Sequence, residues 1–339
     1  MIETEQQLEE ALSAPSPADL DAMRSLPGDL LLLGAGGKMG PSLARLAVRA
    51  CRQAGVSKRI LAASRFTEAG LADSLRASGI DAISCDLLDD SALRALPDCP
   101  NILYMTGRKF GSTGQEWLTW AMNALAPARV AERFPRSRIV AFSTGNVYPL
   151  TPASGLGPDE SHPTGPVGEY AQSCIGRERM FEYFSHLHGT PVAILRLNYA
   201  IDLRYGVLRD VAEKVRGRCP IDLSMGVVNV IWQRDANSVA LRSFAHAASP
   251  PFLLNLTGAE KVSIRSLAER FGRVFGVPPV FEGTESPTAL LSNAALCRRL
   301  FGPPTVTLDQ MVDWVAQWVS IGGRGLDKPT HYEQRDGRF

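Results

Sequence analysis

The sequence predicts an α/β protein in which a doubly wound parallel sheet is joined by a small, mostly helical second domain. Three observations support this fold class. The segment 29–33 is an apolar run that leads into glycines, which is typical of a central strand buried on both faces. Strand-like and helix-like segments then alternate as far as residue 197. Beyond that residue the alternation loosens, so a second unit built from the later segments is expected.

Size and charge limit the classes of function. The chain has 339 residues, which is long enough for two compact units. With 36 basic and 35 acidic residues, the formal charge is +1, so neither nucleic acid nor a membrane surface is expected as a partner. No apolar run approaches the roughly 20 residues that span a bilayer, and the first residues lack the pattern of a signal peptide. Six scattered cysteines predict free thiols in a cytoplasmic protein without a metal site.

The elements are expected in the following order. Residues 1–28 hold two short helical segments, and Ser16 and Pro17 form the N-cap and first position of the second. Trp314 and Trp318 share one face of the last helix and should pack into the core. The intervening elements are strands at 59–64, 80–85, 101–105, 138–143 and 192–197, a helix at about 205–217, a return strand at 229–232, a helix from about 235, a strand at 253–256 and a helix from 263.

The chain is thereby divided into four expected parts. They are a helical extension (1–28), a sheet domain (29–197 with 228–256), a second domain (198–227 with 257–321) and a C-terminal tail (322–339).

A glycine loop follows the first strand and reads Gly34-Ala35-Gly36-Gly37-Lys38-Met39-Gly40. The fingerprint G-x-G-x-x-G would need glycine where Met39 stands, but the spacing G-x-x-G-x-x-G fits. Small residues let the backbone approach a pyrophosphate, and a helix starting near Pro41 directs its N-terminal amides toward it. The loop therefore predicts a dinucleotide site in a Rossmann-type sheet. A tight strand–helix turn without a ligand is the less favoured alternative.

The end of the second strand bears on the choice of cofactor. An acidic residue there would bind the ribose of NAD, whereas an arginine accommodates the 2′-phosphate of NADP. The strand ends in Ser64 and Arg65 without a carboxylate. The cofactor is therefore expected to be NAD(P), with NADP favoured over NAD. An exposed Arg65 that binds nothing is the alternative.

The segment 141–148, Ala-Phe-Ser-Thr-Gly-Asn-Val-Tyr, is followed by Glu160, Pro163, Pro166 and Tyr170. Together with the glycine loop, these motifs resemble the extended short-chain dehydrogenases/reductases of the NAD-dependent epimerase/dehydratase family, over roughly residues 29–260. The resemblance implies hydride transfer, in which Tyr170 acts as general acid or base and Thr144 orients the substrate oxygen.

The resemblance also implies roles for other residues. Cofactor contacts are expected from Asp86, Thr106 and Asn198, and substrate contacts from Arg108, Asn146, Tyr199 and Arg204. The small second domain would bind substrate. A homodimer is implied too, formed by the helix that carries Tyr170 and the helix at about 115–133.

The family pattern is broken at Cys174, where the resemblance implies a lysine that lowers the pKa of the tyrosine. A free tyrosine has a pKa near 10, and a neutral thiol cannot lower it as an ammonium does. Another cation could substitute, namely Arg177 on the same helix face, or Arg108 or Lys109. Alternatively, Tyr170 acts as a neutral acid in reductions, or the protein is a sensor or scaffold that binds NAD(P) without turnover. Cys174 as a nucleophile is disfavoured, because no histidine lies near it in sequence.

The substrate is expected to be small. Relatives that act on nucleoside-diphosphate sugars carry an arginine seven residues before an aspartate. Aligning that aspartate with Asp235 places Val228 there, and Glu282 stands near a second missing arginine. A sugar, sugar acid or hydroxy-ketone of carbohydrate metabolism is therefore expected. A nucleotide-sugar epimerase or dehydratase, with diphosphate contacts rearranged to Arg204, Arg209 or Arg234, is the alternative.

Overall fold

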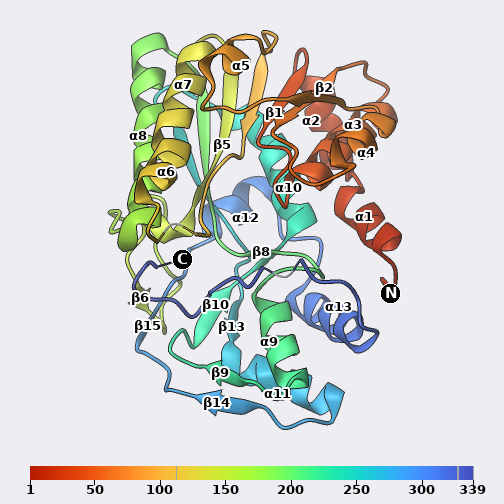
Figure 1. Cartoon of the computed structure of the whole chain (residues 1–339), viewed down its shortest axis with the longest axis vertical. Helices are drawn as coiled ribbons and strands as arrows, with labels where there is room; N and C mark the ends of the chain where they lie inside the picture. The colour runs from red at the N-terminus through yellow and green to blue at the C-terminus, as the bar shows by residue number, and fades with distance from the viewer. Residues whose placement is uncertain (112, 327, 339) are drawn as a thin grey trace.

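A seven-stranded parallel sheet forms the centre of the computed structural model, which describes residues 1–111, 113–326 and 328–338 (Figure 1). Its strand order is β12-β7-β5-β4-β1-β2-β3, so the chain winds in both directions from β1. The predicted doubly wound α/β fold is confirmed. The strands are β1 (Leu30–Leu33), β2 (Ile60–Ser64), β3 (Asp81–Ser84), β4 (Asn101–Tyr104), β5 (Arg138–Thr144), β7 (Val192–Leu197) and β12 (Phe252–Leu256).

The leucines of β1 explain why this strand is apolar throughout. Leu30 and Leu32 pack into the core on one face of the sheet, and Leu31 and Leu33 pack into the core on the other. Helices therefore cover both faces (Figure 1). One face carries α2 (Pro17–Ser25), α3 (Gly40–Ala54), α4 (Leu71–Ala77) and α10 (Gln233–Arg242), and the other carries α5 (Asp90–Arg94), α7 (Ala126–Arg133) and α8 (Gly168–His188).

The helix expected at about 115–133 contains a π-helical turn. It consists of α6 (Glu116–Trp120), the π-helical turn Ala121–Leu125 and α7, which follow one another without a break. This composite helix packs beside α8, and both lie on the outer face of the molecule (Figure 1).

The N-terminal extension is built into the fold. Ser16 caps α2 as predicted, because its side chain accepts a hydrogen bond from the amide of Asp19. Leu8 and Leu12, on α1 (Glu5–Ser13), pack into the core of the second domain, whereas Met23 on α2 packs into the sheet core. The two N-terminal helices therefore join both halves of the molecule.

The second domain surrounds a core of its own. The predicted single return strand at 229–232 is wrong, because β10 (Val227–Asn229) pairs with β13 and β11 (Ile231–Trp232) pairs with β8. An unpredicted helix, α12 (Ala295–Phe301), packs Cys297 and Phe301 into the sheet core. The other elements are β8 (Ala200–Ile201), α9 (Val207–Arg216), β9 (Pro220–Asp222), β13 (Lys261–Ser263), α11 (Ile264–Phe275), β14 (Val280–Glu282) and α13 (Leu308–Ser320). A small pair, β6 (Thr151–Pro152) with β15 (Thr288–Ala289), packs Ala289 into the core of the second domain.

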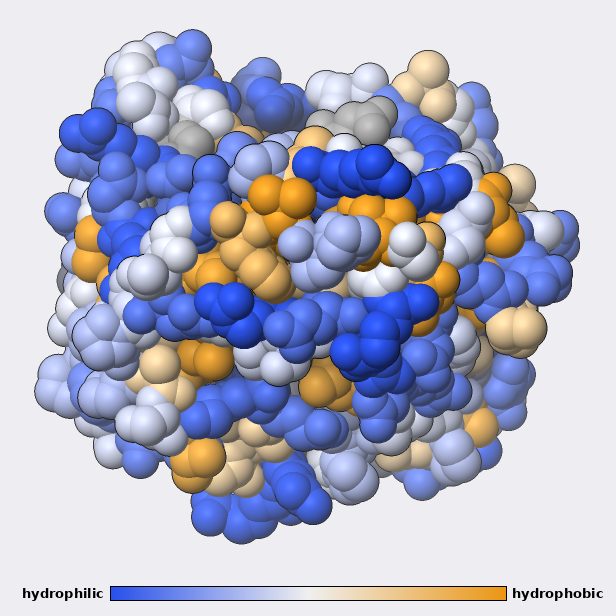
Figure 2. All heavy atoms as spheres, turned by 90° about the horizontal axis from the view of Figure 1, so that it is seen from below, coloured by the Kyte–Doolittle hydropathy of each residue, from blue (hydrophilic) through white to orange (hydrophobic). Residues whose placement is uncertain are grey.

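The tail runs back across the second domain. Leu326 donates its amide to the carbonyl of Arg204, and Tyr332 is fully buried in the second core. Trp318 is buried in the same core, as predicted. Figure 2 shows the surface on this side, where apolar side chains lie in small groups among hydrophilic ones. Within the described ranges, no helix has the length and apolar character needed to cross a membrane.

Candidate active site

A cleft of about 330 Å³ lies between the carboxyl ends of the central strands and the second domain. The residues that line it come from the glycine loop, from the ends of β4, β5 and β7, from α8, from the segment that enters α9, and from the tail. The polar and charged ones are Lys38, Lys109, Ser143, Thr144, Asn146, Tyr170, Arg177, Asn198, Tyr199, Tyr205 and Thr330.

The geometry of the glycine loop fits a dinucleotide. A side chain at Gly34, where φ is +89°, would collide with Thr106, and one at Gly40 would collide with the carbonyl of Ala35. A Cβ at Gly37 would meet only the carbonyl of Gly34, at 3.4 Å, so the backbone there is open to the cleft. No side chain caps the first turn of α3, which leaves its amides available to an anion. The loop can therefore hold the pyrophosphate of a nicotinamide dinucleotide.

Lys38 extends from this loop across the cleft. Its ammonium donates to the carbonyl of Ala200 at 2.7 Å and lies 4.0 Å from the centre of the Tyr205 ring. Burial within the cleft lowers the pKa of Lys38 to about 8, and the nearby carboxylate of Asp202 opposes this shift. Six residues of this loop are expected to bind cofactor. Four of them, Gly34, Gly37, Lys38 and Met39, line the cleft, whereas Gly36 and Gly40 shape the turn.

Tyr170 and Thr144 meet on the floor of the cleft, and Cys174 is buried next to Tyr170. Tyr170 and Cys174 are one turn apart on α8, and the Tyr170 hydroxyl is hydrogen-bonded to both Thr144 and Cys174. The Thr144 hydroxyl accepts the amide of Asn146 at 3.2 Å and donates to its side-chain oxygen at 3.1 Å. The structure thus brings together the predicted catalytic residues and Asn146.

The chemistry of this group follows from its burial. Burial raises the pKa of Tyr170 far above its ordinary value, and Cys174 adds to the shift, while Arg177 and Thr144 oppose it. Burial also raises the pKa of the Cys174 thiol. At neutral pH both groups carry their protons, so Tyr170 can donate a proton but is not poised to accept one.

Arg177 places a buried cation beside this pair. Its guanidinium donates to the carbonyl of Phe142 and to the side-chain oxygen of Asn123, both at 2.8 Å. A Cβ at Gly107 would lie 2.5 Å from the same guanidinium, so residue 107 has to be small. Gly107 and Asn123 are site residues that sequence reasoning missed. Asn123 shows no local signal, because its partners lie far along the chain.

Lys109 lines the same cleft, whereas Arg108 does not. The Lys109 ammonium donates to the carbonyl of Thr330 at 3.2 Å, and burial lowers the pKa of Lys109 to about 8. The guanidinium of Arg108 is directed instead to the carbonyl of Gly111 and the side chain of Gln115. Arg108 is thus engaged outside the cleft lining, and its expected substrate contact stays a prediction.

The expected adenosine-end residues lie outside the cleft. Arg65 is paired with Asp86 at 3.9 Å, and both side chains are substantially exposed. The Ser64 hydroxyl lies 2.6 Å from the place that a Cβ would take at Gly36, so it contacts the loop directly. The Thr106 hydroxyl, beside Gly34, is buried and has no hydrogen-bond partner among the described residues.

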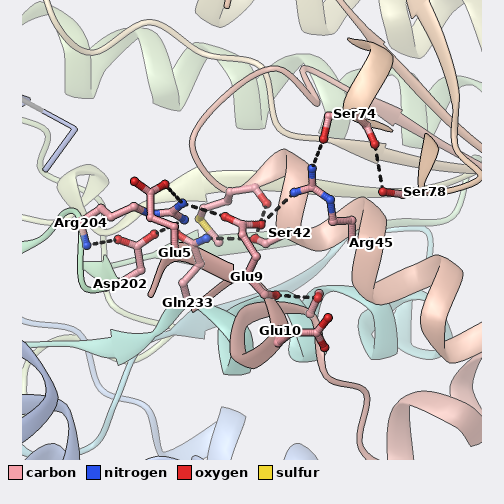
Figure 3. A network of polar contacts seen from close by, with 12 residues as sticks. Glu5, Glu9, Glu10, Ser42, Arg45, Ser74, Ser78, Asp202, Arg204 and Gln233 are labelled. Atoms are coloured by element: carbon pink, nitrogen blue, oxygen red, sulfur yellow. Dashed lines mark hydrogen bonds and ion pairs between the residues drawn. The ribbon is translucent and has the colours of Figure 1, made fainter. Parts of the chain in front are cut away.

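Arg204 is used in a structural network rather than in the cleft (Figure 3). It pairs with Glu9 at 2.7 Å and with Asp202 at 3.0 Å, and Glu9 also pairs with Arg45 on α3. Arg204 is therefore engaged by α1 and by Asp202 and does not line the cleft, and its expected substrate contact stays a prediction. The other two candidates for diphosphate contacts, Arg209 and Arg234, are likewise absent from the cleft lining. Arg209 pairs with Glu213, and Arg234 pairs with Asp19 and Asp235.

Asn198 and Tyr199 lie on the wall of the cleft that faces the second domain. Asn198 donates to the side chain of Asn229 at 2.8 Å, which ties the end of β7 to β10. Tyr199 adopts a left-handed backbone with φ of +44° and lines the cleft. Glu178 has a structural role, since it accepts from Arg196 at 2.7 Å and from Ser143 at 2.6 Å.

Comparison with known families gives this site its context. The model of the NAD dependent epimerase/dehydratase family matches residues 30–201, which is just over half of the chain. The chain belongs to this family. The predicted identification as an extended short-chain dehydrogenase/reductase is confirmed, and the protein is an enzyme of the NAD-dependent oxidoreductase and epimerase type. A search of curated proteins found no significant match.

Solved structures of the family share the fold. A UDP-glucose 4-epimerase from Thermotoga maritima, solved with UDP-glucose, has a TM-score of 0.70 at 13% identity and covers 86% of this chain and 98% of its own. A UDP-glucuronic acid 4-epimerase from Bacillus cereus, solved with NAD, gives 0.70 at 16% identity, with 86% and 98% covered. A short-chain dehydrogenase/reductase superfamily protein from Agrobacterium tumefaciens, with bound NAD, gives 0.69 at 18% identity, with 86% and 97% covered.

Proposed function

We propose that this enzyme interconverts C–OH and C=O on a small, sugar-like polar substrate that is not a nucleoside-diphosphate sugar. The observation that carries the proposal is the Tyr170 hydroxyl, hydrogen-bonded to Thr144 on the floor of the cleft that the glycine loop borders. A cytoplasmic location and a role in carbohydrate metabolism stay predictions from the sequence.

The chain's own residues supply proton transfer and orientation. When bound, the nicotinamide would donate or accept a hydride. Tyr170 would give its proton to the substrate carbonyl oxygen, and Thr144 would hydrogen-bond the same oxygen. Because the pKa of Tyr170 is raised, its proton-donating form predominates at neutral pH, which favours reduction.

Arg177 is the cation best placed to stabilise the tyrosinate that proton donation leaves. Its two hydrogen bonds fix the guanidinium, and its charge opposes the rise in the pKa of Tyr170. Arg108 is directed away from the cleft, and Lys109 is held by the tail. We therefore assign to Arg177 the electrostatic role that the resemblance gives to the lysine at position 174.

Two features support a substrate smaller than a nucleotide sugar. Val228 is fully buried in the core of the second domain, and Glu282 is exposed on β14, so neither place offers a diphosphate contact. The cleft of about 330 Å³ lies at the lower end of the range for ligand pockets and includes the glycine loop.

The substitution Tyr170→Phe tests this function. The consumption of reduced cofactor should be followed with a panel of small carbonyl compounds, and cofactor binding should be measured by calorimetry. Loss of a general acid should reduce turnover by about 10²–10⁴-fold while cofactor binding is kept. Tyr183→Phe is the matched control, because Tyr183 is exposed on the same helix. Unchanged turnover in Tyr170→Phe would refute the proposal.

A further inference from the structure

The ammonium of Lys38 joins the glycine loop to the second domain. It donates to the carbonyl of Ala200 at 2.7 Å and lies 4.0 Å from the centre of the Tyr205 ring. All three residues line the cleft, and Lys38 stands just before α3 begins at Gly40. A pyrophosphate held by the amides at this end of the loop would therefore share the cleft with the ammonium.

A buried carboxylate stands behind this contact. Asp202 lies two residues beyond Ala200, and its side chain is fully buried. Burial lowers the pKa of Lys38 to about 8, and the charge of Asp202 is the largest influence that opposes this shift. Of the other charges around Lys38, Arg204 adds to the lowering and Asp210 opposes it. Asp202 therefore contributes more than any other carboxylate to keeping Lys38 positively charged.

The N-terminal helix α1 supports the position of Asp202 (Figure 3). Arg204 donates to Asp202 from its backbone amide at 2.7 Å and from its guanidinium at 3.0 Å. The same guanidinium donates to Glu9 of α1 at 2.7 Å, and Glu9 also accepts from Arg45 of α3 at 2.8 Å. Glu9 thus neutralises part of the charge of Arg204 and ties Asp202 to the helix that follows the glycine loop.

We propose that Asp202 is a positioning residue for cofactor binding, because it holds the ammonium of Lys38 where this group attracts the pyrophosphate. The helix α1 supports Asp202 through Glu9 and Arg204. The second domain and the N-terminal extension then contribute to cofactor affinity, although neither belongs to the glycine loop. The inference goes beyond the proposed function and holds for any substrate, since it concerns the cofactor alone.

Calorimetry on the full chain with NADP, and with NAD as a second probe, tests the proposal across a range of pH. The charged form of Lys38 attracts the pyrophosphate, and without the Asp202 carboxylate that form should be lost about one pH unit lower. The dissociation constant of Asp202→Asn, relative to wild type, should therefore rise by up to about 10-fold between about pH 6 and pH 9. Taking this ratio removes the titration of the cofactor and of other groups. Glu269→Gln, at an exposed carboxylate on α11, is the control and should give a constant ratio.

The variant Lys38→Arg should show the opposite trend. Arginine keeps its charge over this range of pH, so the dissociation constant of the variant relative to wild type should fall as pH rises. A merely structural role would instead weaken binding equally at every pH.

If Asp202→Asn does not fold, Glu9→Gln serves in its place. Arg204 then loses the carboxylate that partly neutralises it, and its charge acts more strongly on Lys38. The ratio of dissociation constants should again rise with pH, by about 2–5-fold, because the lost charge lies farther away.

Three results would overturn the proposal. They are a ratio that does not rise with pH in Asp202→Asn, or in Glu9→Gln where it is the substitute, a ratio that does not fall in Lys38→Arg, and binding of neither cofactor by the wild type. Failure of the proposed function is distinguishable, because it would appear as turnover that survives Tyr170→Phe, which cofactor binding does not measure.

Discussion

The positive charge of Arg177 lowers the pKa of Tyr170, although Arg177 lies seven residues, or two helical turns, farther along α8. Its guanidinium is buried, is fixed by Phe142 and Asn123, and lines the same cleft as the Tyr170 hydroxyl. Cys174 lies between them on the same face and is hydrogen-bonded to Tyr170. The departure from the family pattern at residue 174 is thus accompanied by a cation one turn farther on.

Replacing Arg177 should affect both stability and turnover. Arg177→Met leaves the carbonyl of Phe142 and the side-chain oxygen of Asn123 without their donor. Because a buried unpaired acceptor costs about 1–3 kcal/mol, the free energy of unfolding should fall by roughly 2–5 kcal/mol. Urea unfolding followed by circular dichroism measures this. Arg177→Lys keeps the charge and should retain more turnover than Arg177→Met, and equal turnover in the two variants would contradict the electrostatic role.

The stability contribution of Lys109 should depend on pH. Burial lowers its pKa from an ordinary 10.5 to about 8, so the folded protein releases this proton at lower pH than the unfolded chain does. The unfolded state therefore binds more protons between about pH 8 and pH 10.5. Across that window the wild type should gain stability relative to Lys109→Met, whereas below about pH 7 the difference should be constant.

Urea midpoints of wild type and Lys109→Met at several pH values check this sign. Taking the difference between the two proteins removes the contributions of tyrosines and cysteines that titrate in the same range. If the stability of the wild type relative to Lys109→Met falls with rising pH, the ammonium is stabilised, rather than destabilised, by its surroundings.

NADP is expected to bind more tightly than NAD. Arg65 is exposed at the end of β2 and is only loosely paired with Asp86, so its guanidinium can turn toward a 2′-phosphate. Arg65→Ala should weaken NADP binding by about 10-fold and leave NAD binding nearly unchanged. Calorimetry with both cofactors decides the matter, and tighter binding of NAD by the wild type would overturn the preference.

We also propose that the enzyme is a homodimer that pairs α8 and the composite helix 116–133 with a second copy. Trp117, Leu125 and Leu187 are exposed on these two helices, although large apolar side chains are usually buried. Leu187→Glu should shift the protein toward the monomer in size-exclusion chromatography with light scattering. Leu156→Glu, at an exposed leucine in a loop, is the control. A monomeric wild type would contradict the proposal.

The parts of the structure set by local patterns could be predicted. Buried strands, the glycine loop and the one-turn spacing of Tyr170 and Cys174 all follow from periodicity, so the sheet and the floor of the cleft were predictable from sequence. The role of Arg204 was not, because its partner Glu9 lies 195 residues away on α1. The same holds for Thr330, whose contacts with Asp210 and Lys109 depend on the path of the tail.

The pH dependence of turnover in Cys174→Lys tests the central claim most directly. If Tyr170 is the group that transfers the proton, a lysine at 174 adds an ammonium one helical turn away to the guanidinium of Arg177 two turns away, and it should lower the pKa that governs alcohol oxidation by about 1–3 units. The pH–rate profile for oxidation by the cofactor-saturated enzyme should move accordingly toward lower pH. A profile that does not move, in a variant that folds and binds cofactor, would contradict the assignment of Tyr170 as the group that transfers the proton.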